Sequence, residues 1–258
     1  MNLSFTGLFS AIPLISAEIS PVLVVYLSTG LGKSRPKSVF CLIFAERKSC
    51  NAIVDVAFII DSSGSISRRN YGKIKAFVKG IAGRLGISTN GSRAGIILYS
   101  TKASVKAYFN DSRTIEEFKR KVDELPHERG LTYINRALEL ASSELFSRAR
   151  KDVPKVAMLL TDGEQSKPES TLNLRDASAP LRQQGVRVIA FGIGKRINVR
   201  ELRLTVERDE DVIRVMKFDD LVTKVGNYTN SLCEAAGKRN QIYGYDNFQD
   251  MRSPHSFL

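Results

Sequence analysis

The sequence predicts an α/β protein with a Rossmann-like, doubly wound sheet, mostly parallel and six-stranded, with one antiparallel edge strand and helices on both faces. From about residue 53 onward, short apolar runs of strand length alternate with amphipathic segments of helix length. That alternation is typical of a parallel sheet covered by helices. One stretch, 93–109, instead reads as two neighbouring strands of a hairpin, which supplies the antiparallel edge.

In the first half of the chain, each element has a local signal. The run 53–60 is apolar and rich in β-branched residues, as buried parallel strands are. Its successor, 68–85, carries apolar residues at helical spacing on one face. Two strands are expected at 93–100 and 103–109, followed by a helix at 114–125 that opens with Thr114 and Glu117 at the spacing of a capping box.

The second half repeats the alternation from a Gly130-Leu131-Thr132 turn onward. A fully apolar buried strand is expected before Thr161-Asp162-Gly163, and Gly185 is expected to end the helix that follows. The expected helices here are 130–148, 170–184, 198–206 and 219–233, and the expected strands are 155–160, 186–193 and 212–218.

The composition is that of an ordinary globular protein with a basic surface. Of 258 residues, 43% are hydrophobic and 26% charged, and the net charge is +12. A basic surface favours anionic partners such as acidic proteins or sulfated glycans. No basic run is interleaved with aromatic residues, so we expect no nucleic-acid partner. The alternative is a solvated basic surface without a dedicated partner.

The ends of the chain differ from its middle. Residues 1–32 are apolar with one acid, Glu18, and we interpret them as a secretory signal peptide that lacks the usual positive start. A membrane-spanning helix is the rival interpretation. We assign 33–49 to a linker, 50–233 to the folded domain and 234–258 to a mobile tail.

The three cysteines help to predict whether the protein is secreted or intracellular. Cys50 and Cys233 bracket the domain, and because the ends of a compact domain often lie close together, a disulfide between them is expected. Two unpaired thiols are the alternative, and Cys41 has no assigned role. Glycosylation sequons begin at Asn90, Asn110 and Asn227, and they matter only in a secreted protein.

Oxygen-bearing side chains gather where the expected strands end. Asp61, Ser63 and Ser65 follow the first strand, Thr132 stands at the start of a helix, and Asp162 ends the strand 155–160. Ligand sites of open α/β sheets lie at the carboxyl ends of the strands. Two carboxylates and three hydroxyls, without histidine or cysteine, suit Mg²⁺, with Mn²⁺ or Ca²⁺ as alternatives. The first loop alone is also consistent with simple helix capping.

Three segments together resemble a known family. Asp61-Ser62-Ser63-Gly64-Ser65, the threonine of Gly130-Leu131-Thr132, and Leu159-Leu160-Thr161-Asp162-Gly163 are similar to the metal-ion-dependent adhesion site of a von Willebrand factor type A (vWA) domain. The cysteines that flank them resemble those of extracellular-matrix members such as matrilins and the type A modules of collagens.

The resemblance implies a division of labour within the site. Ser63, Ser65 and Thr132 would approach the metal directly, Asp61 and Asp162 would act largely through bound water, and a partner's carboxylate would complete the coordination. Leu131 stands where the family usually has a second glycine, a departure that removes no ligand.

These observations favour a secreted, non-enzymatic binding module that recognises an acidic residue of a protein partner, such as a collagen or another matrix protein, through Mg²⁺. The alternatives are a structural matrix protein that binds anionic partners through its basic surface, and an intracellular type A protein of complex assembly. A hydrolase is disfavoured, because His127 and His255 are the only histidines and no nucleophile or base stands beside the metal ligands.

Overall fold

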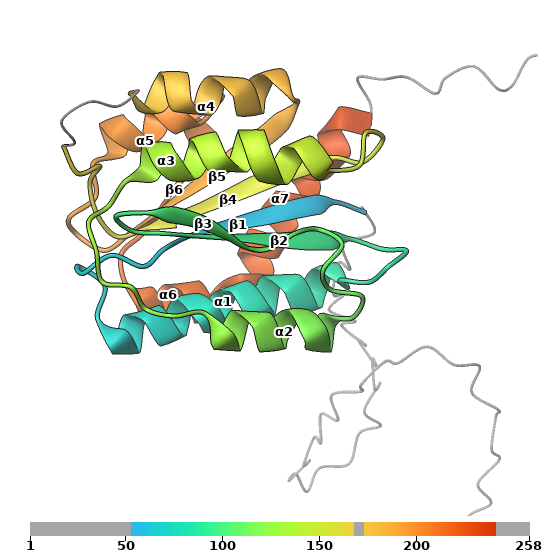
Figure 1. Ribbon diagram of the computed structural model, residues 1–258, viewed down its shortest axis with the longest axis horizontal. Coiled ribbons are helices and arrows are strands. Elements are labelled where there is room, and N and C mark those ends of the chain that lie inside the picture. The colour runs from blue at the N-terminus through green and yellow to red at the C-terminus, as the bar shows by residue number, and fades with distance from the viewer. Residues whose placement is uncertain (1–52, 168–172, 241–258) are drawn as a thin grey trace, which may run out of the picture. The chain divides into compact units, whose positions relative to one another are not determined.

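The computed structural model describes residues 53–167 and 173–240, which form a six-stranded sheet between two layers of helices (Figure 1). The strand order is β3-β2-β1-β4-β5-β6, and every neighbouring pair is parallel except β2 and β3. The predicted fold class, with its single antiparallel edge strand, is therefore confirmed. The strands are β1 (Asp55–Asp61), β2 (Arg93–Tyr99), β3 (Ala103–Ala107), β4 (Lys155–Thr161), β5 (Val186–Ile193) and β6 (Val212–Val215).

Each face of the sheet has its own group of helices and its own hydrophobic core (Figure 1). Alternate residues of β1 point to opposite faces, so Phe58 and Ile60 enter one core while Ala57 and Ile59 enter the other. The first core is covered by α1 (Arg68–Leu85), α2 (Ile115–Glu124), α6 (Phe218–Thr223) and α7 (Val225–Asn240). The second is covered by α3 (Ile134–Leu140), α4 (Leu174–Gln183) and α5 (Val199–Thr205).

The topology fixes where the functional loops lie. From β1 the chain passes to β2 and β3 on one side, and later to β4, β5 and β6 on the other. The order therefore reverses at β1 and β4, and the crevice beyond the carboxyl ends of such strands is the usual ligand site. In the pairing of β1 with β4, Ile60 lies opposite Leu160, which brings the residues after both strands to one edge of the sheet.

The helix expected at 130–148 differs in detail. Helical structure starts only at Ile134, and after α3 it widens to a π-turn (Ala141–Leu145) and then tightens to a 3₁₀ turn (Phe146–Arg148). The hydroxyls of Ser142 and Ser143 both donate to the carbonyl oxygen of Glu139, at 2.8 and 2.9 Å. Such bonds compete with the helical ladder, which accounts for the irregular second half.

The closing helix is the largest difference from expectation. Instead of one helix over 219–233, α6 ends at Thr223 and α7 runs on to Asn240, beyond the boundary predicted at residue 233. The break is at Lys224, whose ψ of 16° departs from helical geometry. Immediately after it, Val225 packs against the bare backbone of Gly80 in α1, within 3.1 Å of the place a Cβ would take.

Most other expected boundaries agree to within two residues. The exceptions are the last strand, which ends at Val215 rather than 218, and α4, which starts at Leu174 rather than 170 because the Asn173 side chain caps it there. The expected signal peptide, linker and Cys50 lie outside the described residues. Among the residues that the structure describes, no helix is long and apolar enough to cross a membrane.

A buried ion pair fastens the amino-terminal end of β1. Asp55 is fully buried, and its carboxylate accepts hydrogen bonds from the backbone and guanidinium of Arg150, the shortest at 2.6 Å. Arg150 also donates to the carbonyl oxygen of Gly91, at 3.1 Å. This end of the sheet is therefore tied to the loops before β2 and β4, opposite the edge where the candidate ligands gather.

Candidate metal centre

Asp61 ends β1 and organises the loop that follows it. One of its carboxylate oxygens accepts the backbone N–H of Ser63 at 2.8 Å, and the other accepts the hydroxyl of Thr161 at 2.7 Å. Thr161 is the last residue of β4, so the fully buried Asp61 joins the ends of the two strands at which the topology reverses. Its role here is to hold two loops together.

The hydroxyls of the same loop extend this network toward solvent. Ser63 Oγ and Ser65 Oγ lie 2.9 Å apart, and Ser65 donates to an Asp162 carboxylate oxygen at 2.5 Å. Asp61, Ser63, Ser65 and Asp162 are thus joined in one series of contacts, the first through the backbone N–H of Ser63 and the others between side-chain oxygens.

Thr132 reaches the same point from the start of α3. A Cβ built on Gly163 would lie 3.8 Å from Ser65 Oγ and 3.9 Å from Thr132 Oγ1. The two hydroxyls therefore stand beside the same backbone position. All five predicted ligands meet at this edge of the sheet.

Thr132 is held in place by the loop after β4. Its backbone N–H donates to the hydroxyl of Ser166 at 3.0 Å, and the N–H of Ser166 donates to the carbonyl oxygen of Thr132 at 2.8 Å. The Gln165 side chain caps α3, accepting the N–H of Ile134 at 2.7 Å, because Tyr133 at the cap position makes no side-chain bond. Sequence reasoning missed Gln165 and Ser166, since nothing in their local pattern indicates a contact more than thirty residues away.

Two further backbone hydrogen bonds hold the loop of Ser62 and Ser63 in place. The N–H of Arg129 donates to the carbonyl oxygen of Ser62 at 2.7 Å, and the N–H of Gly64 donates to that of Gly130 at 2.9 Å. A Cβ on Gly130 would lie 2.9 Å from the backbone nitrogen of Thr101, so this approach requires glycine. Its neighbour Leu131, 51% exposed, stands at the rim of the site.

The electrostatics of the site favour a cation. Burial is the main cause that raises the pKa of Asp61 from its usual 3.8 to about 6, and its bonds to Ser63 and Thr161 only partly oppose this. Burial likewise raises the pKa of Asp162. Two partly desolvated carboxylates beside three neutral hydroxyls form a site in which a divalent cation would relieve the cost of the buried charge.

The donor set also fits a hard cation. Among the described residues, no three His, Cys, Asp or Glu side chains form a group that could hold a metal ion by themselves. The oxygens of Asp61, Ser63, Ser65, Thr132 and Asp162 are of the kind that Mg²⁺, Mn²⁺ and Ca²⁺ accept.

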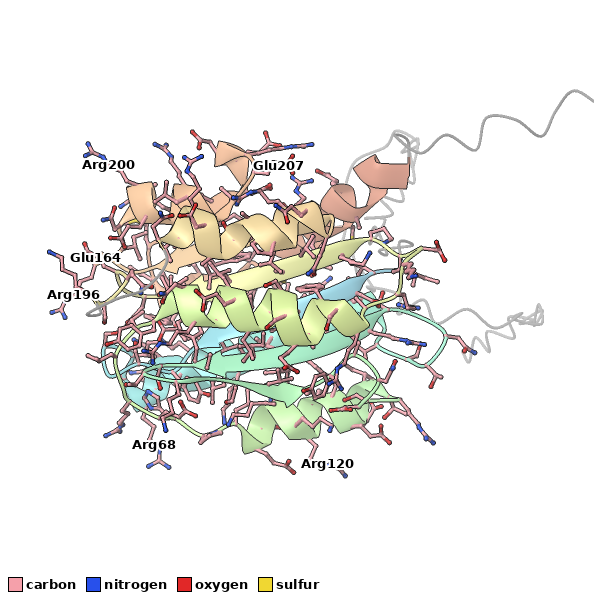
Figure 2. The ribbon with its side chains drawn as sticks, turned by 45° about the horizontal axis from the view of Figure 1, so that its top comes forward. Arg68, Arg120, Glu164, Arg196, Arg200 and Glu207 are labelled. Atoms are coloured by element: carbon pink, nitrogen blue, oxygen red, sulfur yellow. The ribbon has the colours of Figure 1, made fainter. Side chains whose placement is uncertain are left out.

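Other residues considered from the sequence lie apart from these oxygens. Glu164 is exposed beside the site (Figure 2). His127 is not a simple surface residue: its ring stacks on Tyr71 with centroids 4.6 Å apart, and its Nε2 lies 3.4 Å from the carbonyl oxygen of Ser63. His255 lies outside the described residues. Gly194, just after β5, has a φ of 96° and belongs to the turn at the strand end.

The secretion-related predictions stay predictions. Because Cys50 lies outside the described residues, the bridge to Cys233 is untested, although Cys233 packs at the edge of the core. The sequon asparagines Asn90, Asn110 and Asn227 are all exposed, which is compatible with glycosylation.

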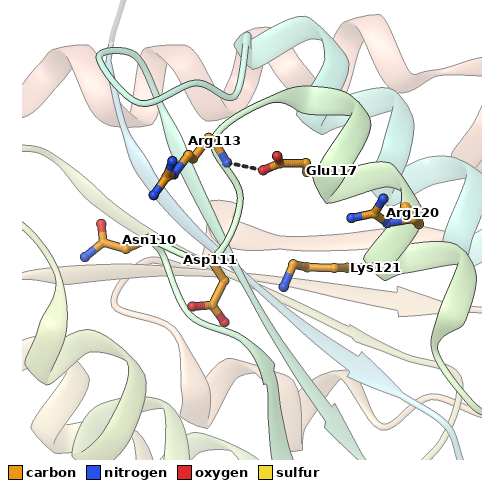
Figure 3. Close-up of a pocket in the computed structure, with 6 residues that line it drawn as sticks. All are labelled: Asn110, Asp111, Arg113, Glu117, Arg120 and Lys121. Atoms are coloured by element: carbon orange, nitrogen blue, oxygen red, sulfur yellow. Dashed lines mark hydrogen bonds between the residues drawn. The ribbon is translucent and has the colours of Figure 1, made fainter.

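Asn110 also borders a shallow pocket of about 400 Å³ between β3 and α2 (Figure 3). Both carboxylates that line this pocket are engaged in local contacts. The Asp111 carboxylate accepts the N–H of Tyr108 at 2.9 Å, and that of Glu117 accepts the N–H of Arg113 at 2.7 Å. These are turn and cap contacts, so this pocket adds no further candidate site.

Known proteins share both the sequence pattern and the fold. The family model "von Willebrand factor type A domain" matches residues 55–226. Among curated relatives, Cuticlin-6 of Caenorhabditis elegans is 28% identical over 70% of this chain and 31% of its own, and mouse Matrilin-2 is 27% identical over 72% and 20%. The mouse collagen alpha-6(VI) chain is 33% identical over 75% of this chain and 9% of its own. The chain thus spans less than a third of the length of these relatives.

Solved structures of proximal thread matrix protein 1 from the mussel byssus are similar as well. One has a TM-score of 0.66 at 25% identity, covering 72% of this chain and 48% of the mussel protein. Another, with equal TM-score and identity, covers 72% and 49% and is described as having zinc in its metal-ion-dependent adhesion site. The matching segment, the shared fold and the five converging oxygens agree: the chain belongs to the von Willebrand factor type A domain family.

Proposed function

We propose that this protein is a non-enzymatic, secreted adhesion module of the extracellular matrix, which binds an acidic residue of a protein partner through a divalent cation, Mg²⁺ being the expected one. The observation that carries the proposal is the chain of contacts from Asp61 through Ser63 and Ser65 to Asp162, with Thr132 beside it across Gly163. The relatives, a matrilin, collagens and a byssal matrix protein, support a matrix role.

The chemistry of the site explains why a carboxylate would be the ligand. Of the two carboxylates in the site, Asp61 is fully buried and Asp162 is partly exposed. Three hydroxyls contribute no formal charge. A divalent cation held by this set would keep part of its charge, and in a partly buried position that charge attracts an incoming carboxylate strongly.

The metal step is tested by calorimetry with Mg²⁺ alone. Asp162→Ala should abolish measurable Mg²⁺ binding while the protein still unfolds cooperatively. Glu164→Ala is the matched control, because it removes an exposed carboxylate two residues away, and it should leave the affinity within about twofold of wild type. Equal Mg²⁺ binding by Asp162→Ala and wild type would contradict the proposed site.

The partner step is tested with a matrix extract, with and without EDTA. Metal-bridged binding should be lost in EDTA and in Asp162→Ala. The second candidate function, a structural matrix protein that binds through its basic surface, is favoured by the net charge of +12 and predicts a different outcome. Such binding would survive EDTA and fall steeply with ionic strength.

The predicted secreted location has its own test. Non-reducing peptide mapping should recover Cys50 joined to Cys233. Alkylation of both as free thiols would instead favour the intracellular alternative.

A further inference from the structure

A basic pocket of about 480 Å³ lies beside the metal loop, on the side of α1. It is lined by Arg68, Tyr71, Gly72, Lys75, Leu125, His127 and Arg129. The stacked rings of Tyr71 and His127 form an aromatic wall, and the Lys75 ammonium stands 5.2 Å from the centre of the Tyr71 ring. Three of the lining side chains carry a positive charge and none carries a negative one.

In the part of the chain that the structure describes, no carboxylate forms an ion pair with the cations of this pocket. Arg68 and Arg129 are exposed, and neither guanidinium pairs with a carboxylate among the described residues. Lys75 uses two of its three N–H groups on the carbonyl oxygens of Asp123 and Leu125, at 3.0 and 2.6 Å. The pocket therefore keeps an excess of positive charge and unused donors.

Two acids close in sequence to the lining residues are engaged elsewhere. The Asp123 carboxylate pairs with Lys79 at 2.6 Å. Glu128 accepts the hydroxyl of Ser100 at 2.7 Å and lies 3.8 Å from Lys106. Neither carboxylate lines the pocket, so an anion would enter without displacing an existing ion pair.

The pocket shares a wall with the metal site. His127 Nε2 lies 3.4 Å from the carbonyl oxygen of Ser63, and the backbone of Arg129 is bonded to Ser62 at 2.7 Å. Arg129 adopts a left-handed φ of 58°, which is uncommon for a residue with a side chain. Figure 2 shows Arg68 at the same end of the molecule as Glu164, which borders the metal loop.

We propose that this pocket binds a second acidic side chain of the same partner whose carboxylate binds the metal. The inference rests on the proposed function and adds to it a two-point recognition of acidic protein segments. Arginine forks suit a planar carboxylate, and linking two weak contacts in one ligand raises affinity by effective concentration.

A protein segment is the occupant we favour over a sulfated glycan. The cations converge on one hollow with an aromatic wall, which suits a single side chain next to the metal-bound one. A glycan chain would use a longer track of cations along the surface.

The test uses hexaglutamate peptide as the probe, with its affinity measured at fixed ionic strength in Mg²⁺ and in EDTA. The pocket variant is Arg68→Gln with Arg129→Asn, because asparagine tolerates the left-handed conformation. The matched control is Lys151→Gln with Arg214→Gln, which removes the same charge from two exposed positions away from the site. The pocket variant should bind hexaglutamate about tenfold more weakly than wild type, and the control within about twofold.

Each outcome of this experiment either supports or contradicts the proposal. If the pocket variant and the control bind hexaglutamate equally, or if wild type does not bind it, the pocket is not a site for acidic side chains. If the pocket residues matter for a heparin hexasaccharide but not for hexaglutamate, the occupant is a glycan and the proposal is wrong. Equal binding of hexaglutamate by wild type in Mg²⁺ and in EDTA would overturn the proposed function instead, because the metal would contribute nothing. With hexaglutamate bound, the backbone amide signals of His127 and Arg129 should shift.

Discussion

Replacing Asp61 by asparagine should stabilise the protein in EDTA at neutral pH and remove its response to Mg²⁺. Burial raises the pKa of Asp61 from 3.8 to about 6, so ionised Asp61 costs the folded state about 3 kcal/mol at neutral pH. Asparagine carries no charge, and its amide can accept the N–H of Ser63 and donate to the Thr161 hydroxyl, which replaces both contacts of the carboxylate.

The sign of the pH dependence follows from proton linkage. Between pH 4 and 6 the folded protein binds more protons at Asp61 than the unfolded chain does, so this residue makes stability fall as pH rises through that window. Asp61→Asn lacks the effect. The stability gap between the variant and wild type in EDTA should therefore be near zero at pH 4 and open to about 3 kcal/mol by pH 7.

Urea denaturation at a series of pH values measures this gap. Comparing variant with wild type at each pH cancels the titration of groups that the two proteins share. Saturating Mg²⁺ should close the gap at pH 7, because the cation compensates the buried charge of wild type alone. A gap that does not change with pH in EDTA would refute the reasoning, since the charge of Asp61 would then cost nothing.

Three further predictions concern the frame around the site. Asp55→Ala should lower the free energy of unfolding by about 3–5 kcal/mol in urea denaturation, because it leaves Arg150 largely buried without its partner. Gln165→Ala should cost about 1–2 kcal/mol through the lost cap of α3 and weaken Mg²⁺ binding in calorimetry, and an unchanged affinity would mean that the cap does not position the site. Gly130→Ala should also weaken Mg²⁺ binding, because its Cβ would meet the backbone of the β2–β3 turn, whereas Gly83→Ala in α1 meets nothing and should be neutral or stabilising by up to about 1 kcal/mol.

The fold could be predicted from the sequence because its signals are local and repeated. Each buried strand of this sheet is an apolar run that a turn residue ends, and each amphipathic helix shows its own period. The errors occur where packing decides. The break at Lys224 is followed directly by the packing of Val225 against Gly80, some 145 positions earlier in the chain, and no local pattern near residue 224 indicates it.

The same distinction separates the parts of the site. The five candidate ligands could be found because they follow strand ends, and parallel topology brings strand ends together. Gln165 and Arg129 could not be found in this way. Gln165 acts on a helix that begins about thirty residues earlier, and Arg129 meets Arg68 across a pocket that only the tertiary structure forms.

The hydrogen bonds of the site indicate that the protein itself fixes the backbone shape, whereas a bound cation would mainly supply charge. Hydrogen bonds within the protein fix the backbone of all three ligand loops. They are made by Asp61, by Ser166 and by the backbone of Arg129 and Gly130. Two contacts join predicted ligands through side-chain oxygens, Ser63 to Ser65 and Ser65 to Asp162, and a cation bound there would take their place. Metal binding at such a site should therefore change charge more than backbone position. A partner would then recognise a surface whose shape is set by the fold, while the cation supplies the attraction for its carboxylate.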